Sequence, residues 1–338
     1  MVELLGAAAV GLAASGAVFV AVLLLRRLHL ARAERVRLDA EARVRPVALA
    51  LVHGEPVELR PVGDRDAQAL AALVARLARS LSGEPRRHVA AFFEASGAIA
   101  REREALRRRA AWRRATAAYA LGDMASAEAV PALLEALDDR EREVRAAAAR
   151  SLGRLGAVHA VEPLVFALVE GRVPRAVAGQ ALLAVGPAAL TALRPLVQHV
   201  EGEVRASAIE LVGLLGDASD EPLLVERLRD TSAEVRAKAC RALGRLAAEE
   251  AAPKLERALE DRIPFVRVNA AGALAALGDR AVVPALLAQA RDDPFFEAAR
   301  AAAHAAARLD PAAVRAASRQ PGAPALLHEA ADVLEIGR

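Results

Sequence analysis

The sequence lacks the residue groups from which most catalytic and metal sites are built. A single cysteine, Cys240, excludes an internal disulfide bond and a cysteine-based zinc site. The seven histidines are scattered singly, and no phosphate-binding, dinucleotide-binding or zinc-protease motif occurs. We therefore expect no enzyme activity, no metal and no cofactor, and we expect Cys240 to be a buried free thiol.

Aromatic residues and lysine are also scarce. Phe, Trp and Tyr make up 3% of the chain, so the core of a chain that is 55% apolar has to be built from alanine, leucine and valine. Lys238 and Lys254 are the only lysines, and this bias towards arginine and alanine is typical of GC-rich bacterial genomes. The net charge of +3 gives the chain as a whole little attraction for polyanions.

One pattern recurs between Ala111 and Asp279. An arginine near the start of one helix returns at steps of 30 or 31 residues, with an alanine three residues later and a bulky aliphatic residue seven residues later. A fixed period of this length predicts a solenoid of stacked repeats. The arginines are Arg114, Arg145, Arg175, Arg205, Arg236 and Arg267; the alanines are Ala117, Ala148, Ala178, Ala208, Ala239 and Ala270; the aliphatic residues are Leu121, Leu152, Leu182, Val212, Leu243 and Leu274.

Each repeat is predicted to be a hairpin of two short helices. In residues 126–156, Pro131 suits the first turn of one helix, and a polar turn at 138–141 leads into a second helix. Gly153 and Gly156 close the repeat, and Gly156 fits a helix C-cap. Alanine lets a neighbouring helix come close, and because one hairpin cannot bury its apolar faces alone, the repeats must stack.

Aspartates before the second helices form another pattern, at Asp139, Asp230, Asp261 and Asp292. We expect each aspartate to cap the helix and the arginines to bridge neighbouring repeats. At a spacing of six residues, the expected pairs are Asp139 with Arg145, Asp230 with Arg236, and Asp261 with Arg267. The alternative is a charged strip facing a ligand. The predicted structural ladder comprises Asp139, Arg145, Arg175, Arg205, Asp230, Arg236, Asp261 and Arg267.

This pattern resembles HEAT repeats, in particular the short HEAT-like repeats of the phycobilin-lyase type, over about 200 of the 338 residues. The resemblance implies an all-α fold, a right-handed α-solenoid of about six to seven hairpins, whose second helices line a concave, protein-binding side. The residues that carry it are the Leu-Gly pairs at 152–153, 155–156, 215–216, 243–244 and 277–278, the Pro-x-Leu-Leu starts at 131 and 284, and the Val-Arg pairs at 144, 204, 235 and 266.

Polar residues vary along the second helices while the apolar positions stay fixed. Such variation fits a binding surface, although a plain solvated face has the same pattern. The column five residues after each repeat arginine reads Tyr119, Arg150, Gln180, Glu210, Arg241 and Gly272, and Arg154 and Arg245 lie nine residues after theirs. The predicted partner-binding residues are Tyr119, Arg150, Arg154, Gln180, Glu210, Arg241 and Arg245.

The amino-terminal segment, residues 1–27, is predicted to be a transmembrane anchor. Its uncharged run, Leu4–Leu25, spans about 33 Å as a helix, enough for a bilayer core of roughly 30 Å. A cleaved signal peptide is the rival, but Met1-Val2-Glu3 is not basic. Seven arginines follow the run by residue 45, so the positive-inside rule places the repeats in the cytoplasm of a bacterial inner membrane, with the amino terminus outside.

Within this run, Ala7, Gly11 and Ser15 share one helix face at four-residue spacing. Small residues at this spacing let two spans pack closely, which would give a homodimer through the membrane helix. A reading that places the repeats outside the cytoplasmic membrane stays open.

The remaining predicted segments are a basic juxtamembrane stalk at 28–45, a degenerate helical cap at 46–110, the repeats at 111–310 and a closing cap at 311–338. Pro46 is expected to end the stalk helix. Val47–Val52 and Val57–Arg60 are expected to form a short strand hairpin in the first cap.

The favoured function is a membrane-tethered scaffold for another, membrane-associated protein. The alternatives are an enzyme like a bilin lyase or a DNA glycosylase, or a nucleic-acid-binding array. Arg101–Arg114 carries seven arginines beside Trp112, a combination that fits phosphate contacts and base stacking. We expect Trp112 instead to lie on a buried face with Leu106. The scarcity of aromatic residues argues against the aromatic-lined cleft of a glycosylase.

Overall fold

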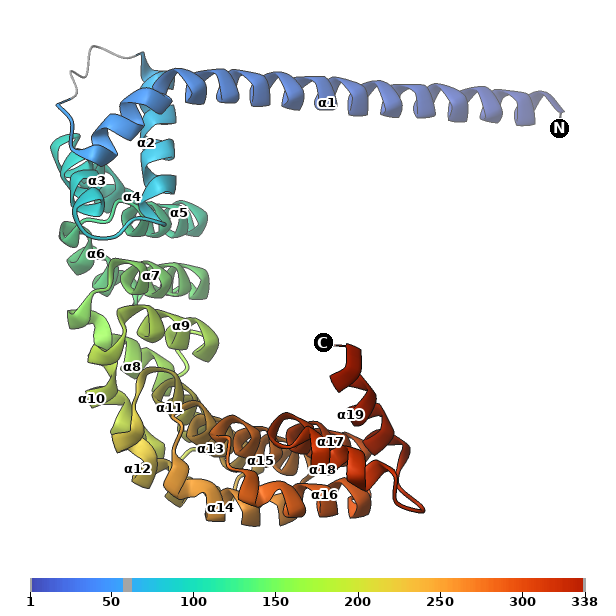
Figure 1. Cartoon of the computed structure of the whole chain (residues 1–338). Coiled ribbons are helices and arrows are strands. Elements are labelled where there is room, and N and C mark those ends of the chain that lie inside the picture. The colour runs from blue at the N-terminus through green and yellow to red at the C-terminus, as the bar shows by residue number, and fades with distance from the viewer. Residues whose placement is uncertain (1, 57–62, 337–338) are drawn as a thin grey trace. The chain divides into compact units, whose positions relative to one another are not determined.

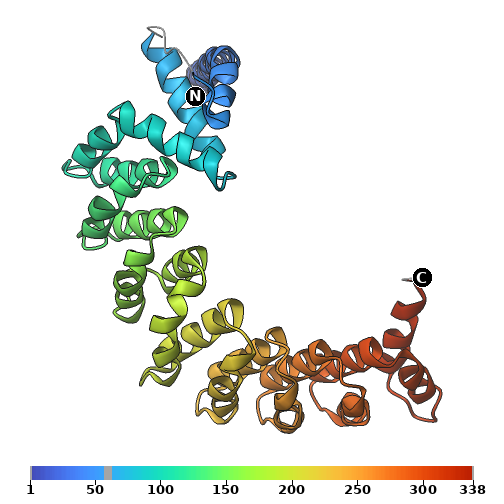
Figure 2. The same ribbon diagram turned by 60° about the vertical axis from the view of Figure 1, so that its left-hand side comes forward.

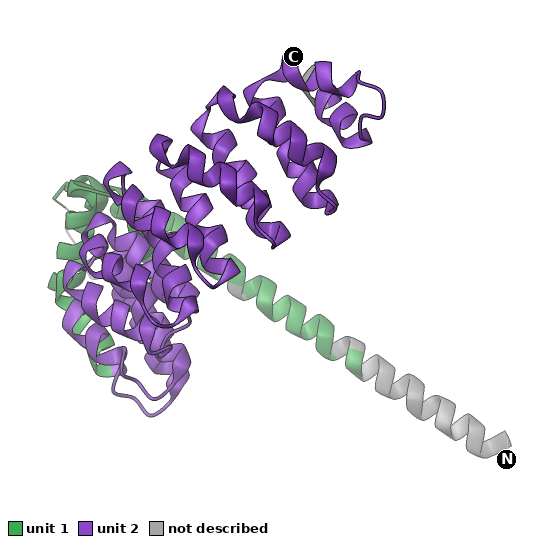
Figure 3. Cartoon of the chain, turned by 90° about the horizontal axis from the view of Figure 1, so that it is seen from below, with its two compact units in different colours: residues 1–104, 123–128 green, residues 105–122, 129–338 purple. Residues whose placement is uncertain are grey.

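The computed structural model describes residues 2–56 and 63–336; for residues 2–18, 20, 21, 33 and 333–336 it describes the helix but not the side chains. Throughout these described ranges the chain forms helices and no strand. It divides into two compact units, shown in Figure 3. Unit 1 comprises residues 1–104 and 123–128, and unit 2 comprises residues 105–122 and 129–338.

Unit 1 contains a long helix whose end differs from the prediction. Helix α1 continues through Pro46 to His53, so the predicted end at Pro46 and the first predicted strand, Val47–Val52, are wrong. Val44, Ala48 and Val52 are buried at four-residue spacing, and packing against two further helices favours a helix there. The second predicted strand, Val57–Arg60, lies outside the described residues. The helices are α1 (Val2–His53), α2 (Asp64–Ala78), α3 (Glu84–Ala95) and α4 (Ala98–Ala105).

The predicted membrane span, Leu4–Leu25, falls within α1, but most of its side chains lie outside the described residues. The small-residue face of Ala7, Gly11 and Ser15 lies there too. Among the residues that the structure describes, no single helix is both long and apolar enough to cross a membrane, and only the pair 175–185 and 187–198, bent by 117°, has suitable length and composition. The structure therefore gives the predicted anchor no support, and the anchor stays a prediction.

Unit 2 is a stack of helical hairpins in two layers (Figures 1 and 2). The second helices form the inner layer of a curve: α5 (Ala111–Asp123), α7 (Arg142–Leu155), α9 (Arg175–Val185), α11 (Gly202–Leu215), α13 (Ala233–Arg245), α15 (Pro264–Leu277) and α17 (Phe296–Leu309). The first helices form the outer layer: α6 (Val130–Ala136), α8 (Val161–Val169), α10 (Leu190–Leu193), α12 (Glu221–Glu226), α14 (Ala252–Arg257) and α16 (Val283–Asp292). Helices α18 (Pro311–Ser318) and α19 (Ala325–Ile336) follow.

Short 3₁₀ helices flank the first helices. They precede the first helix of a repeat at η1 (Ala127–Ala129), η2 (Val158–Ala160), η3 (Pro187–Ala189), η5 (Ala218–Asp220), η7 (Glu249–Ala251) and η9 (Arg280–Val282). They extend it at η4 (Arg194–Gln198), η6 (Arg227–Arg229) and η8 (Ala258–Glu260). The repeat with Pro187 and Pro195, irregular in sequence, has its first helix reduced to four residues, because proline cannot donate a helix hydrogen bond.

The core of unit 2 follows the predicted columns. The repeat alanines and the aliphatic residues four positions later are all at most 1% exposed, which confirms both columns. Gly156 has φ of +66° and ends α7, as the C-cap prediction requires.

A glycine column, eight residues after the repeat arginine, sets how closely the second helices approach. A Cβ atom on Gly153 would lie 2.6 Å from Cα of Ala181, and one on Gly244 would lie 2.8 Å from Cα of Ala273. Gly153 therefore lies at a close helix contact inside α7, rather than at the end of a repeat as the sequence suggested. The same position holds Gly122 and Gly213.

Candidate inner-face binding site

The repeat arginines join consecutive repeats, but not through the predicted pairs. Arg236 Nε and Nη2 donate to the two carboxylate oxygens of Asp261, in the next repeat, at 2.6 and 2.9 Å. Its Nη1 donates to the backbone carbonyl oxygen of Asp230 at 2.9 Å. The predicted pairing six residues apart is therefore wrong. The aspartate six residues before the arginine offers only its main-chain oxygen, and the carboxylate belongs to the aspartate of the next repeat. The equivalent pairs are Arg114–Asp139, Arg205–Asp230 and Arg267–Asp293.

Two repeats in the middle use other partners. Arg145 Nε donates to the carbonyl oxygen of Arg172 at 2.7 Å, and its Nη1 donates to the carbonyl oxygen of Asp139 at 2.8 Å. Arg175 forms ion pairs with Glu203 and, at 3.5 Å, with Glu201. At these two junctions the repeat arginine therefore pairs with no aspartate carboxylate, although Arg145 does reach the main-chain oxygen of Asp139.

The aspartates close the turn before each second helix. Asp139 accepts a hydrogen bond from the backbone N–H of Glu141 at 2.8 Å, while Glu141 itself is the helix N-cap residue. The expected capping role is thus corrected to a turn-closing role. In the last repeat this residue is Asp293, not Asp292 as predicted.

These contacts also set the charge state of the aspartates. Burial on its own would raise the pKa of Asp261, but the hydrogen bonds from Arg236 and from the backbone N–H of Ile263 outweigh burial and lower it. The pKa values of Asp139, Asp230 and Asp293 are lowered in the same way, because hydrogen bonds to each carboxylate outweigh the effect of burial. The aspartates are therefore ionised at neutral pH, and each carboxylate is engaged by an arginine within unit 2.

The structure brings four of the predicted partner-binding residues together. Tyr119, Arg150, Arg154 and Gln180, from α5, α7 and α9, line a hollow of about 230 Å³ with Ala184. These helices present consecutive second-helix surfaces, so residues about 30 positions apart in the chain become neighbours.

Contacts within this hollow orient its cationic groups. Arg150 Nη1 donates to Tyr119 Oη at 2.9 Å. The guanidinium carbon of Arg154 lies 5.7 Å from the centre of the Tyr119 ring, and Arg154 Nη2 donates to Ser151 Oγ at 3.0 Å. The hollow thus combines guanidinium groups, a phenol and an amide, a set that can bind a carboxylate through forked hydrogen bonds.

The other three predicted residues form a second cluster, on α11 and α13. Glu210 forms an ion pair with Lys238, and the positive charges of Arg241 and Arg245 also favour its ionised form. Burial on its own would raise the pKa of Glu210, but Lys238 and the two arginines outweigh this and lower it. The sequence reasoning missed Lys238, although it lies three residues before Arg241 and so on the same helix face.

We use the name inner face for the exposed side of the second helices that carries these two clusters. Its cationic residues are Arg150, Arg154, Lys238, Arg241 and Arg245. Two acids lie among them, Glu210 and Glu234, and both form ion pairs with Lys238. The inner face at these clusters is therefore positively charged.

The predicted burial of Trp112 is wrong, since its side chain is 64% exposed. The guanidinium carbon of Arg113 lies 5.2 Å from the centre of its ring. Arg114, in contrast, is buried in the ion pair with Asp139. The arginine-rich stretch therefore contains both a structural arginine and an exposed aromatic group.

Cys240 is a buried free cysteine, as predicted. Burial raises the pKa of its thiol to about 12, so it stays protonated at neutral pH and is a poor nucleophile. Within the described part of the chain, no three His, Cys, Asp or Glu side chains are grouped so that they could hold a metal ion.

The family profile for HEAT repeats matches residues 100–183 and 221–307, just over half of the chain. No curated protein matches the sequence significantly. Human deoxyhypusine hydroxylase is 26% identical over 80% of this chain and 97% of its own, with a TM-score of 0.32. The complex of CpcE and CpcF of phycocyanin lyase from a Nostoc species is 24% identical, covering 69% of this chain and 93% of that one, with a TM-score of 0.36. A designed armadillo repeat protein is 20% identical, covering 63% of this chain and 100% of its own, with a TM-score of 0.33.

Proposed function

Because the chain belongs to the HEAT-repeat family, we propose that it is a scaffold that binds another protein on its inner face. The observation that carries this proposal is the hollow in which Tyr119, Arg150, Arg154 and Gln180 converge. Three successive second helices supply these polar groups, while the alanine and aliphatic columns beneath them stay constant. A regular frame that presents irregular polar groups is suited to reading one partner surface.

The partner is expected to be acidic where it meets the inner face. Arg150 and Gln180 are exposed, so they can contact a partner without first breaking the core. Arg241 and Arg245 supply further positive charge next to the Lys238–Glu210 ion pair. Complementary charge would speed association and exclude basic proteins.

Charge reversal of the inner face tests this proposal. Replacing Arg150 and Arg241 with glutamate should weaken partner binding at least tenfold, about 1.4 kcal/mol, because like charges would then face each other. The partner would be captured by crosslinked pull-down of the full-length protein and identified by mass spectrometry, and its affinity then measured with both forms. Arg280→Glu/Arg319→Glu, at two exposed arginines outside the inner face, is the control with a matched charge change. Equal affinity of the double variant and the control would contradict the proposal.

We further propose that residues 1–27 tether this scaffold to a bacterial inner membrane, with the repeats in the cytoplasm and a membrane-associated protein as the partner. The uncharged run Leu4–Leu25 and the arginines that follow it support this. The full-length protein should sediment with membranes and resist extraction by alkaline carbonate, and a reporter at its carboxyl terminus should be active only in the cytoplasm. Recovery in the soluble fraction, or a carboxyl terminus outside the cytoplasm, would refute the tether while leaving the inner-face proposal untouched.

A further inference from the structure

Two hollows on the outer layer of unit 2 occupy equivalent places in the repeat. One, of about 490 Å³, lies between α6 and α8, and the other, of about 350 Å³, lies between α12–η6 and α14–η8. Leu133 and Leu224 are the fully buried leucines of the leading first helices, and Leu164 and Leu255 are those of the following ones. Each residue that lines a hollow can be given a position relative to these leucines, so that equivalent positions of the two hollows can be compared.

The same positions carry opposite chemistry in the two hollows. Five residues after the first buried leucine stand Asp138 in one and Arg229 in the other. Two residues after the second buried leucine stand Phe166 in the α6–α8 hollow and Arg257 in the other. The residue just before that leucine is a proline in the α6–α8 hollow and Lys254 in the other. The repeat frame therefore does not dictate positive charge at this place, and one hollow carries three cations that its counterpart lacks.

The α6–α8 hollow has one lining cation, Arg172, which is paired with residues of the same hollow, and Glu162 adds a second acid to the lining. Arg172 Nη1 lies 2.7 Å from Asp138 Oδ1, and its guanidinium carbon lies 5.9 Å from the centre of the Phe166 ring. A cation, an acid and an aromatic ring thus satisfy one another there.

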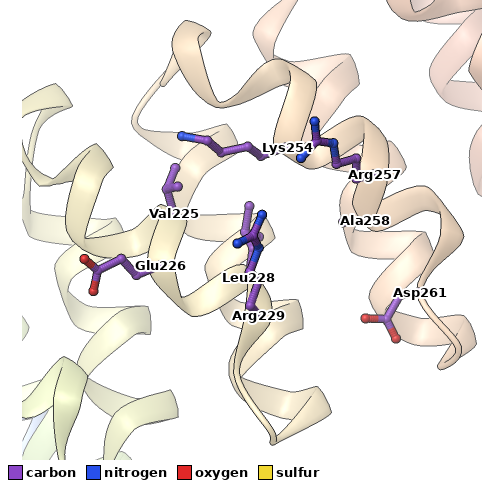
Figure 4. Close-up of a pocket in the computed structure, with 8 residues that line it drawn as sticks. All are labelled: Val225, Glu226, Leu228, Arg229, Lys254, Arg257, Ala258 and Asp261. Atoms are coloured by element: carbon purple, nitrogen blue, oxygen red, sulfur yellow. The ribbon is translucent and has the colours of Figure 1, made fainter.

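In the second hollow the acids of the lining are not paired with its cations. Asp261, at its edge, is engaged by Arg236 at 2.6 Å, and Glu226 lies 3.1 Å from Arg227. Figure 4 shows the Glu226 carboxylate pointing away from the space into which Arg229 points.

The three cations of this hollow face one another. Figure 4 shows Lys254 and Arg257 pointing from α14 towards the helix that carries Val225, and Arg229 pointing back towards them. Among the described residues, no acid forms a hydrogen bond or ion pair with any of these three. Lys254 acts only through space on Glu221, at the start of α12, whose pKa its charge tends to lower. Three like charges around one hollow repel each other unless an anion sits between them.

We propose that this hollow, lined by Arg229, Lys254 and Arg257, binds a phosphate-type dianion. Guanidinium groups donate forked hydrogen bonds that match phosphate oxygens, and the lysine adds a point charge. A volume of about 350 Å³ admits a phosphate or pyrophosphate group, and Val225, Leu228 and Ala258 form its apolar lining. The site lies on the outer layer and does not depend on the inner-face proposal.

Titration of the full-length protein with inorganic pyrophosphate at constant ionic strength tests this site. The double variant Arg229→Gln/Arg257→Gln should bind pyrophosphate at least tenfold more weakly, and Lys254→Gln should weaken binding to a lesser degree. Because these side chains are exposed, the variants should keep the melting temperature of the unaltered protein. Arg280→Gln, an exposed arginine outside the hollow, should bind as the unaltered protein does. Equal pyrophosphate binding by the double variant and this control, or no binding by the unaltered protein, would overturn the site.

Two further titrations distinguish the source of the phosphate. Vesicles of phosphatidylcholine with and without phosphatidic acid test a lipid phosphate; the full-length protein and the double variant share residues 1–27, so only the hollow differs between them. The site is assigned to a lipid headgroup if vesicle binding depends on phosphatidic acid, is lost in the double variant and is reversed by pyrophosphate. It is assigned to a soluble phosphate if the protein binds pyrophosphate but shows no vesicle binding that depends on phosphatidic acid. Binding of poly-glutamate, but not of pyrophosphate, would replace this proposal with a carboxylate site.

Discussion

Replacing Arg267 with methionine is expected to lower the free energy of unfolding of the neighbouring repeats by about 3 kcal/mol. Arg267 and Asp293 form a buried pair, with side chains 9% and 2% exposed, and Nη2 of the arginine lies 2.6 Å from Oδ1 of the aspartate. Methionine preserves much of the side-chain volume but leaves the carboxylate buried without its cation. Removing one partner of a buried ion pair costs about 3–5 kcal/mol, and the remaining hydrogen bonds from Phe295 N–H and Gln289 Nε2 place this case at the lower end.

Hydrogen exchange and urea unfolding measure this effect, and protection should fall mainly in α15 and α17. Arg300→Met is the matched control, because the Arg300–Glu297 pair has side chains 43% and 69% exposed and should contribute less than about 1 kcal/mol. A loss below about 1 kcal/mol for Arg267→Met would show that these pairs do not hold the repeats together.

The same pair makes a prediction about pH. Burial on its own would raise the pKa of Asp293, but the hydrogen bonds from Arg267 and Phe295 lower it below that of the unfolded chain. A group with a lowered folded pKa contributes stability above its unfolded pKa, and this stability is lost as the pH falls through the folded value. The difference between the unaltered protein and Arg267→Met should therefore shrink below about pH 4. A constant difference down to pH 2 would exclude an ionic origin.

Replacing Gly153 with alanine is expected to destabilise the α7–α9 contact by about 1–3 kcal/mol, the usual cost of overpacking. The new methyl group would lie 2.6 Å from Cα and 2.9 Å from the carbonyl oxygen of Ala181, so a backbone would have to move. This loss exceeds the gain of up to about 1 kcal/mol that alanine brings to a helix interior.

Gly272→Ala is the control for this substitution, because a Cβ atom on Gly272 meets nothing within 4 Å. It should raise stability by up to about 1 kcal/mol through helix propensity alone. Urea unfolding of both variants should therefore shift in opposite directions. A stabilising Gly153→Ala change would mean that α7 and α9 are not in the close contact described above.

The core of unit 2 could be predicted because its determinants recur within one helix. Ala239 and Leu243 lie one helical turn apart, so their burial follows from the period alone. The partner of Arg236 could not be found in this way. Asp230 and Asp261 are both turn aspartates, and only the stacking of the repeats places Asp261 opposite the guanidinium group.

The prediction failed where local sequence signals competed with packing. Pro46 and the β-branched residues after it favoured a break and a strand, but Val44, Ala48 and Val52 form an apolar stripe that is buried only in a continuous helix. The outer cationic hollow was missed for another reason: Arg229 and Arg257 are 28 residues apart, and no periodic column contains both.

The claim that the inner face of unit 2 is the partner-binding surface is tested most directly by site-specific photocrosslinking in living cells. Benzoylphenylalanine would replace Gln180, which is exposed beside the inner hollow, or Phe166, which is 54% exposed on the outer layer. The proposal predicts one crosslinked protein from position 180 that disappears when Arg150 is reversed to glutamate, and no such product from position 166. Capture of the same protein from position 166 and none from position 180 would contradict it.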